Sequence, residues 1–197
     1  DTLEVVSIET IKGSFGTLAV YGTPADSVRA GLKLFNVEFD LVVSGINDGP
    51  NLARDILYSG TVGAAQEAKI QGVNAIAISA DSLNIEYIYD ETIKTLDEVI
   101  ESEVYDFDGI LNINFPRFNF EKPKGVLFTR QGRRYFHTEL VKKSNHEDKY
   151  YLKGSISQFD EEEISDVWAY DNGYISITPL TLDRTNEEML KMLSKKQ

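Results

Sequence analysis

Two short runs of sequence carry the residues whose chemistry suits a phosphate ligand. The run 44–51, SGINDGPN, offers the amides of Asn47 and Asn51, whose oxygens can ligate a hard cation and whose nitrogens can donate to phosphate. The run 58–61, YSGT, precedes a helix-like segment, where free N–H groups and the helix dipole attract anions, so the hydroxyls of Ser59 and Thr61 could bind phosphate. Each run also has a plainer interpretation, because Asn and Gly form turns and Ser or Thr caps helices.

The segments around these runs alternate between strand and helix. The apolar segments 41–43, 75–79 and 110–115 are typical of buried strands, and they are separated by helix-like segments at 61–71 and about 89–102. This order predicts an α/β fold with a mostly parallel sheet, helices on both faces, and the run 44–51 as a loop at the carboxyl end of a strand. No G-x-G-x-x-G run follows the first strand, which disfavours a dinucleotide-binding domain.

Other segments complete the expected organisation. Residues 4–10 and 17–21 predict two strands joined by a turn, and a helix follows with Thr23 as its cap and Pro24 at its first position. We expect one domain over 1–197, with an α/β core at about 1–121 and a β-rich appendage and C-terminal arm at about 122–197. The run 185–188, TNEE, is a capping-box pattern before an amphipathic helix, which either docks on a partner subunit or packs on its own domain.

Composition narrows the possible partners. The 197 residues include no cysteine, which excludes disulfides and thiolate ligands and fits the cytoplasm. A net charge of −12 repels nucleic-acid backbones, so no nucleic-acid duplex is expected as a partner. No apolar run approaches the roughly 20 residues that a membrane span needs, so no membrane is expected either.

Eight blocks of this sequence resemble, in order and spacing, the signature blocks of the SurE nucleotidase family. They are GTPAD at 22–26, DLVVSGIN at 40–47, GPN at 49–51, YSGTVGAA at 58–65, AIAIS at 75–79, NINFP at 112–116, TRQG at 129–132 and GYISITPL at 173–180. The resemblance covers about 21–180. It implies a three-layer, Rossmann-like SurE fold and an assembly into homodimers or homotetramers.

The resemblance also implies an activity, namely metal-dependent hydrolysis of nucleoside 5'-monophosphates, and in some members of short polyphosphate, with Mg²⁺ or Mn²⁺. By this resemblance Asn47 is a metal ligand, and Asn51, Ser59, Gly60 and Thr61 lie on the phosphate side of the pocket. Asn47, Ser59 and Thr61 are therefore the expected catalytic residues.

This sequence departs from the family pattern in its metal ligands. The family's Asp-Asp pair after the first strand, and a serine of a later loop, have no match here, so we expect the opening βα segment to be missing. A lone asparagine does not hold a divalent ion, so the chain as it stands is expected to be inactive. The alternative is a non-catalytic module that binds a nucleotide or a partner and keeps the phosphate loop.

A few other side chains invite a functional interpretation. His137 and His146 stand alone, without a spaced metal or nucleophile partner, and are interpreted as structural. Asp48 and Asp55 lie near the phosphate runs and are interpreted as solvated surface charges. The run 133–136, RRYF, could meet a base or a neighbouring subunit, or could simply form an exposed hairpin.

Overall fold

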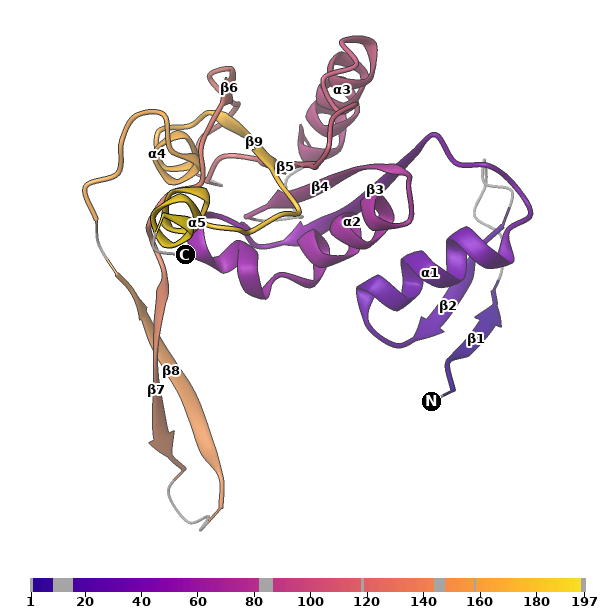
Figure 1. Cartoon of the computed structure of the whole chain (residues 1–197), viewed down its shortest axis with the longest axis horizontal. Coiled ribbons are helices and arrows are strands. Elements are labelled where there is room, and N and C mark those ends of the chain that lie inside the picture. Colours follow the sequence, from indigo (N-terminus) through magenta and orange to yellow (C-terminus); the bar gives the residue numbers. More distant parts are fainter. Residues whose placement is uncertain are drawn as a thin grey trace.

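A five-stranded sheet lies at the centre of the molecule (Figure 1). The computed structural model describes residues 2–8, 16–81, 87–117, 119–143, 148–157 and 159–195. The strands follow the order β3 (Leu41–Asp48), β4 (Asn74–Ala80), β5 (Ile110–Asn114), β9 (Ile175–Leu180), β6 (Val126–Phe128). β3, β4 and β5 are parallel, whereas β9 runs antiparallel to β5 and β6 is parallel to β9. The predicted, mostly parallel α/β sheet is confirmed.

Helices cover both faces of this sheet, because β4 presents alternate side chains to each of them. Ala75 and Ala77 pack under α2 (Gly60–Ile70), where their small side chains let the alanine-rich helix approach the sheet closely. Ile76 and Ile78 belong to the larger core on the opposite face, which α3 (Tyr87–Glu101) covers with Ile88 and Val99. Figure 1 shows α2 and α3 on opposite sides of the sheet. The molecule therefore has the three layers that the resemblance implies.

Helix α1 (Pro24–Leu34) packs against α2. Thr23 caps α1 and Pro24 occupies its first turn, as predicted. The Asp26 side chain completes a capping box with Thr23, which was not predicted from the sequence. The Arg29 guanidinium forms a two-point ion pair with Glu67 of α2, at 2.8 and 2.9 Å. Near the start of α2, a Cβ added at Gly60 would lie 3.0 Å from Pro24 Cγ, so the two helices approach closely there.

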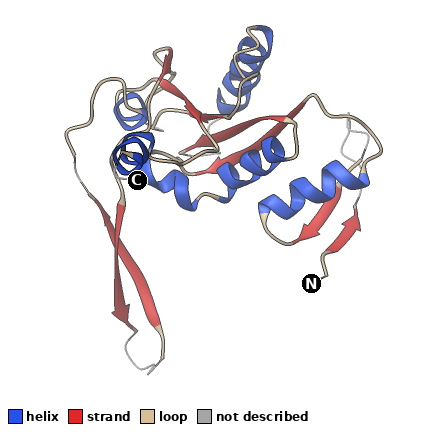
Figure 2. Cartoon of the chain, in the orientation of Figure 1, coloured by secondary structure: helices blue, strands red, loops and turns tan. Residues whose placement is uncertain are grey.

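Two antiparallel ribbons and two short helices complete the described chain (Figure 2). β1 (Glu4–Ser7) pairs with β2 (Leu18–Tyr21), as expected. β7 (Phe136–Lys142) pairs with β8 (Tyr150–Ile156), and this hairpin projects away from the sheet with every strand residue exposed. α4 (Asp166–Asp171) packs near β9, and α5 (Glu187–Ser194) buries no residue. No described helix has the length and apolar character needed to cross a bilayer.

Two expectations about the second half of the chain need correction. Residues beyond 121 do not form only an appendage and an arm, because β6 and β9 complete the central sheet. Most residues of β9 are buried there. The C-terminal helix is capped by Asn186, whose side chain accepts from Met189 N, and not by Thr185, which instead hydrogen-bonds Asp183. A cap one residue later suffices because Asn is as good a cap as Thr.

Candidate functional site

The end of β3 and the start of α2 meet at Asn47 and Thr61. The Thr61 hydroxyl donates to Asn47 Oδ1 at 3.1 Å, and Asn47 Nδ2 donates to Gly49 O at 2.8 Å. β3 continues to Asp48 because Asn47 and Asp48 pair with the end of β4 after an irregularity in register. The expectation that 44–51 is wholly a loop is therefore wrong for 44–48. The sheet itself holds Asn47 in place.

The first turn of α2 leaves donors for an anion. Ser59 is the N-cap, and its hydroxyl accepts from Val62 N at 3.1 Å. The N–H groups of Gly60 and Thr61 precede the first intrahelical bond, and the described part of the chain offers them no acceptor. Free N–H groups and the positive end of a helix dipole are features that favour an anion. Asn47, Ser59, Gly60 and Thr61 thus lie together, as the sequence predicts.

Asn51 takes part in a buried amide network behind this site. Its main-chain N–H donates to Asn114 Oδ1 at 2.8 Å, and its carbonyl accepts from Asn112 Nδ2 at 2.8 Å and from Asn114 Nδ2 at 3.1 Å. Its own side-chain nitrogen donates to Ser79 Oγ at 2.7 Å. The role of Asn51 in binding phosphate stays a prediction, whereas its contacts attach the chain between β3 and α2 to β4 and β5.

A second anchor, which the sequence does not reveal, is the carboxylate of Asp166 at the start of α4. It is fully buried and accepts from the N–H groups of Ala53, Gly132 and Val167 at 2.9, 2.9 and 2.7 Å. Burial raises the pKa of Asp166, although these three bonds oppose the rise. Ala53 opens the short 3-10 helix η1 (Ala53–Tyr58), which leads into Ser59. Because 113 residues separate Asp166 from Ala53, no local spacing could have signalled the contact.

The other charged residues near the site differ in their exposure. Asp48 is exposed, as expected. Asp55 is not simply a solvated charge, because its side chain is 35% exposed and lies 4.0 Å from the buried Arg134. Partial burial raises the pKa of Asp55, and Arg134 opposes the rise. His137 is exposed on β7, and His146 lies outside the described residues.

The described residues fit a divalent cation only in part. Asn47 provides one amide oxygen at the strand end, a suitable ligand for a hard cation. Within the described ranges, no group of three or more His, Asp or Glu side chains could hold a metal ion. Mg²⁺ and Mn²⁺ need several more oxygen ligands than Asn47 alone supplies.

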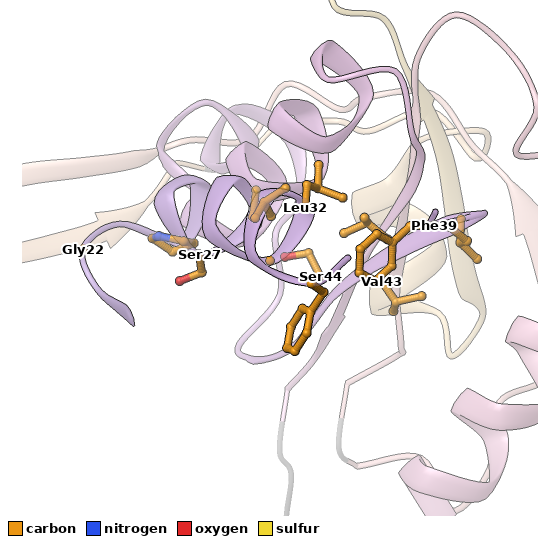
Figure 3. A pocket seen from close by; sticks show the side chains of 13 residues that line it. Gly22, Ser27, Leu32, Phe39, Val43 and Ser44 are labelled. Atoms are coloured by element: carbon orange, nitrogen blue, oxygen red, sulfur yellow. The ribbon is translucent and has the colours of Figure 1, made fainter. Parts of the chain in front are cut away.

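A separate apolar pocket of about 540 Å³ lies between α1 and β3 (Figure 3). The pocket is lined by the large apolar side chains of Leu32, Phe39 and Val43. The smaller residues Gly22 and Ser44 also line it. Charged side chains are absent from this lining as described, so no side chain there offsets the negative charge of a phosphate. The candidate site is the junction of Asn47 with the start of α2.

Comparison with known proteins assigns a family to this arrangement. The family model described as survival protein SurE matches residues 2–138. The chain belongs to the SurE family. The SurE-family protein called 5'-nucleotidase SurE from Aquifex aeolicus (strain VF5) is 38% identical over 197 residues, covering 96% of this chain and 78% of that protein. A 5'-nucleotidase SurE from Clostridium beijerinckii is 40% identical over 188 residues, covering 90% of this chain and 72% of that one.

The fold agrees with that of a solved SurE protein. The crystal structure of the SurE protein from Aquifex aeolicus superposes with a TM-score of 0.78 at 37% sequence identity, covering 100% of this chain and 80% of that chain. The SurE blocks around Asn47 and Thr61 thus lie in a fold shared with that structure.

Proposed function

We propose that this protein, when further ligands complete the metal site at Asn47, hydrolyses nucleoside 5'-monophosphates to a nucleoside and phosphate, with short polyphosphate as a second substrate. The observation that carries the proposal is the hydrogen bond of Asn47 to Thr61 in the first turn of α2, where the N–H groups of Gly60 and Thr61 precede the first intrahelical bond. The names of the SurE relatives support this substrate class.

The chain's own residues bind and orient the phosphate. The N–H groups of Gly60 and Thr61 would donate to phosphoryl oxygens, and the dipole of α2 would stabilise negative charge that develops during hydrolysis. Ser59 keeps the first turn in shape by capping Val62 N. Asn51 would contribute from the segment that the buried amide network fixes.

We also propose a requirement for Mg²⁺ or Mn²⁺, with Asn47 Oδ1 as one ligand among several. Such an ion supplies positive charge next to the phosphate and activates water at neutral pH. The support is the amide oxygen of Asn47 at the carboxyl end of β3, beside the phosphate-binding turn.

Phosphate release from AMP tests this proposal. Release should require added Mg²⁺ or Mn²⁺ and should stop after chelation with EDTA. Turnover that survives thorough chelation would contradict the metal requirement, and an absence of turnover with every divalent ion would contradict hydrolysis.

A second candidate function is a non-catalytic module that binds a nucleotide or a partner. It is favoured by the absence, within the described ranges, of a cluster of acidic side chains beside Asn47. AMP would then raise the melting temperature of the protein without release of phosphate, whereas the enzyme would show both effects.

We further propose that the protein forms a homodimer or a homotetramer. The support is the large exposed apolar side chains on the β7–β8 hairpin and on α5, including Leu140, Leu152 and Met192 at 68%, 70% and 60% exposure. Such surfaces are typical of subunit contacts. A molar mass from light scattering that matches one chain would contradict this proposal.

A further inference from the structure

A pocket with aromatic walls lies between η1 and the base of the β7–β8 hairpin. It has a volume of about 560 Å³, which is within the range of small-molecule sites. It is lined by residues of both elements, namely Arg54, Asp55, Leu57, Tyr58, Tyr135, Phe136, Thr138 and Leu152.

The rings of this pocket are held in place on the hairpin side. The Arg54 guanidinium lies over the Tyr135 ring at 5.4 Å, and the Phe159 ring lies 5.9 Å from Tyr135. The Phe136 ring packs over Gly154 of β8, where any Cβ would collide with it. Tyr135 and Phe136 are therefore positioned before any ligand arrives.

The pocket adjoins the phosphate-binding turn through the chain itself. Tyr58 forms part of the pocket wall and directly precedes Ser59, the N-cap of α2. The Arg54 N–H donates to Arg134 O at 3.1 Å, which joins η1 to the segment entering the hairpin. A ligand whose phosphate sits on Gly60 and Thr61 therefore has this pocket next to it.

We propose that this pocket binds the base of the nucleotide, with Tyr58, Tyr135 and Phe136 as stacking surfaces and Asp55, Arg54 and Thr138 as polar contacts. This inference rests on the proposed function, because it assigns the remainder of the substrate whose phosphate binds at α2.

The chemistry of the pocket favours a base over an apolar segment of another protein. Aromatic faces stack on any base, and a cation beside them strengthens the contact. A carboxyl group, a guanidinium and a hydroxyl in one small pocket give both donors and acceptors for ring nitrogens and exocyclic groups. Tyr58 is 89% exposed, so its ring face is accessible to a ligand.

Two substrates that differ only by the base test this assignment. AMP and ribose 5-phosphate share the phosphate and the sugar, so the ratio of their kcat/KM values reports recognition of adenine. Tyr58→Ala and Tyr135→Leu should each lower this ratio about 10-fold, because stacking on one aromatic ring contributes on the order of one decade of affinity. Tyr58 is almost fully exposed, so its replacement leaves folding intact. Phe128→Ala, which removes an exposed ring on β6, should leave the ratio unchanged.

Binding of adenosine, measured by NMR line broadening, separates this inference from the proposed function. If no substrate is hydrolysed, adenosine binding that both tyrosine variants weaken about 10-fold would still support the pocket. If AMP is hydrolysed but the ratio and adenosine binding are the same in all variants, the pocket assignment is wrong and the function stands. If the tyrosine variants change only the molar mass of the assembly, a second copy covers this surface and the assignment is likewise wrong.

Discussion

Replacing Asn114 by alanine removes the contact that fixes the chain between β3 and α2. Asn114 is fully buried, and its side chain makes hydrogen bonds of 2.8 and 3.1 Å to the main chain of Asn51. After the change the Asn51 N–H has lost its acceptor, whereas the Asn51 carbonyl keeps its bond from Asn112. An unsatisfied buried N–H costs about 1–3 kcal/mol, and the second lost bond costs about 1 kcal/mol.

We therefore expect Asn114→Ala to lower the free energy of unfolding by about 2–4 kcal/mol, a large share of the roughly 5–15 kcal/mol typical of a domain. With a urea slope of about 2 kcal/mol/M, the unfolding midpoint should fall by about 1–2 M. Hydrogen exchange of the Asn51 amide should accelerate more than that of amides in α3, because the loss is local.

A matched control is Asn74→Ala, at the start of the neighbouring strand β4, whereas Asn114 lies at the end of β5. The Asn74 side chain contacts Lys69 and Asp106 at a partly exposed position, so its removal should cost less than about 1 kcal/mol. Equal midpoints for Asn114→Ala and the wild type, with unchanged exchange of the Asn51 amide, would refute the role given to the buried amide network.

Three further changes test other parts of the molecule. Thr61→Val should lower kcat/KM for AMP about 10-fold and Thr61→Ser should restore it, because only the serine keeps the hydroxyl bond to Asn47; equal kinetics of the two variants would contradict this. Gly45→Ala should lower the free energy of unfolding, measured by urea denaturation, by at least about 2 kcal/mol, because φ is +135° and the new Cβ would collide with Ile78 O. Gly63→Ala in α2 meets open space and should raise the free energy of unfolding by about 0.5–1 kcal/mol. Arg29 holds the pKa of Glu67 below its ordinary value, so the stability from this pair is present above that value and is lost as the pH falls through the lowered pKa. The melting temperature of Glu67→Gln should be lower than that of the wild type at neutral pH, and the difference should shrink in acid; a constant difference would contradict the pairing.

Local patterns were sufficient to predict the elements that build the site. Thr23 and Pro24 indicate the start of a helix, and in the structure Thr23 caps α1 and Pro24 lies in its first turn. The apolar run 75–79 and the small residues of 61–71 indicate a strand and a helix that pack closely against each other. In such folds the carboxyl end of a strand lies next to the start of the helix that follows it. The proximity of Asn47 and Thr61 follows from that rule.

The parts that could not be predicted depend on contacts between distant residues. Asn114 meets Asn51 across 63 positions, and Asp166 meets Ala53 across 113, so neither anchor leaves a local signal. β3 extends to Asp48 only because β4 supplies a pairing partner for residues that otherwise favour a turn. For the same reason the sequence does not reveal that β6 and β9 complete the central sheet.

The central claim is that the end of β3 and the first turn of α2 bind one phosphoryl group beside a cation. A crystal structure of the protein soaked with Mn²⁺ and phosphate tests it most directly, since the anomalous signal locates the ion. The account predicts phosphate oxygens within hydrogen-bond distance of the Gly60 and Thr61 N–H groups and the ion on Asn47 Oδ1. Phosphate and ion bound elsewhere, with the first turn of α2 facing only solvent, would contradict it.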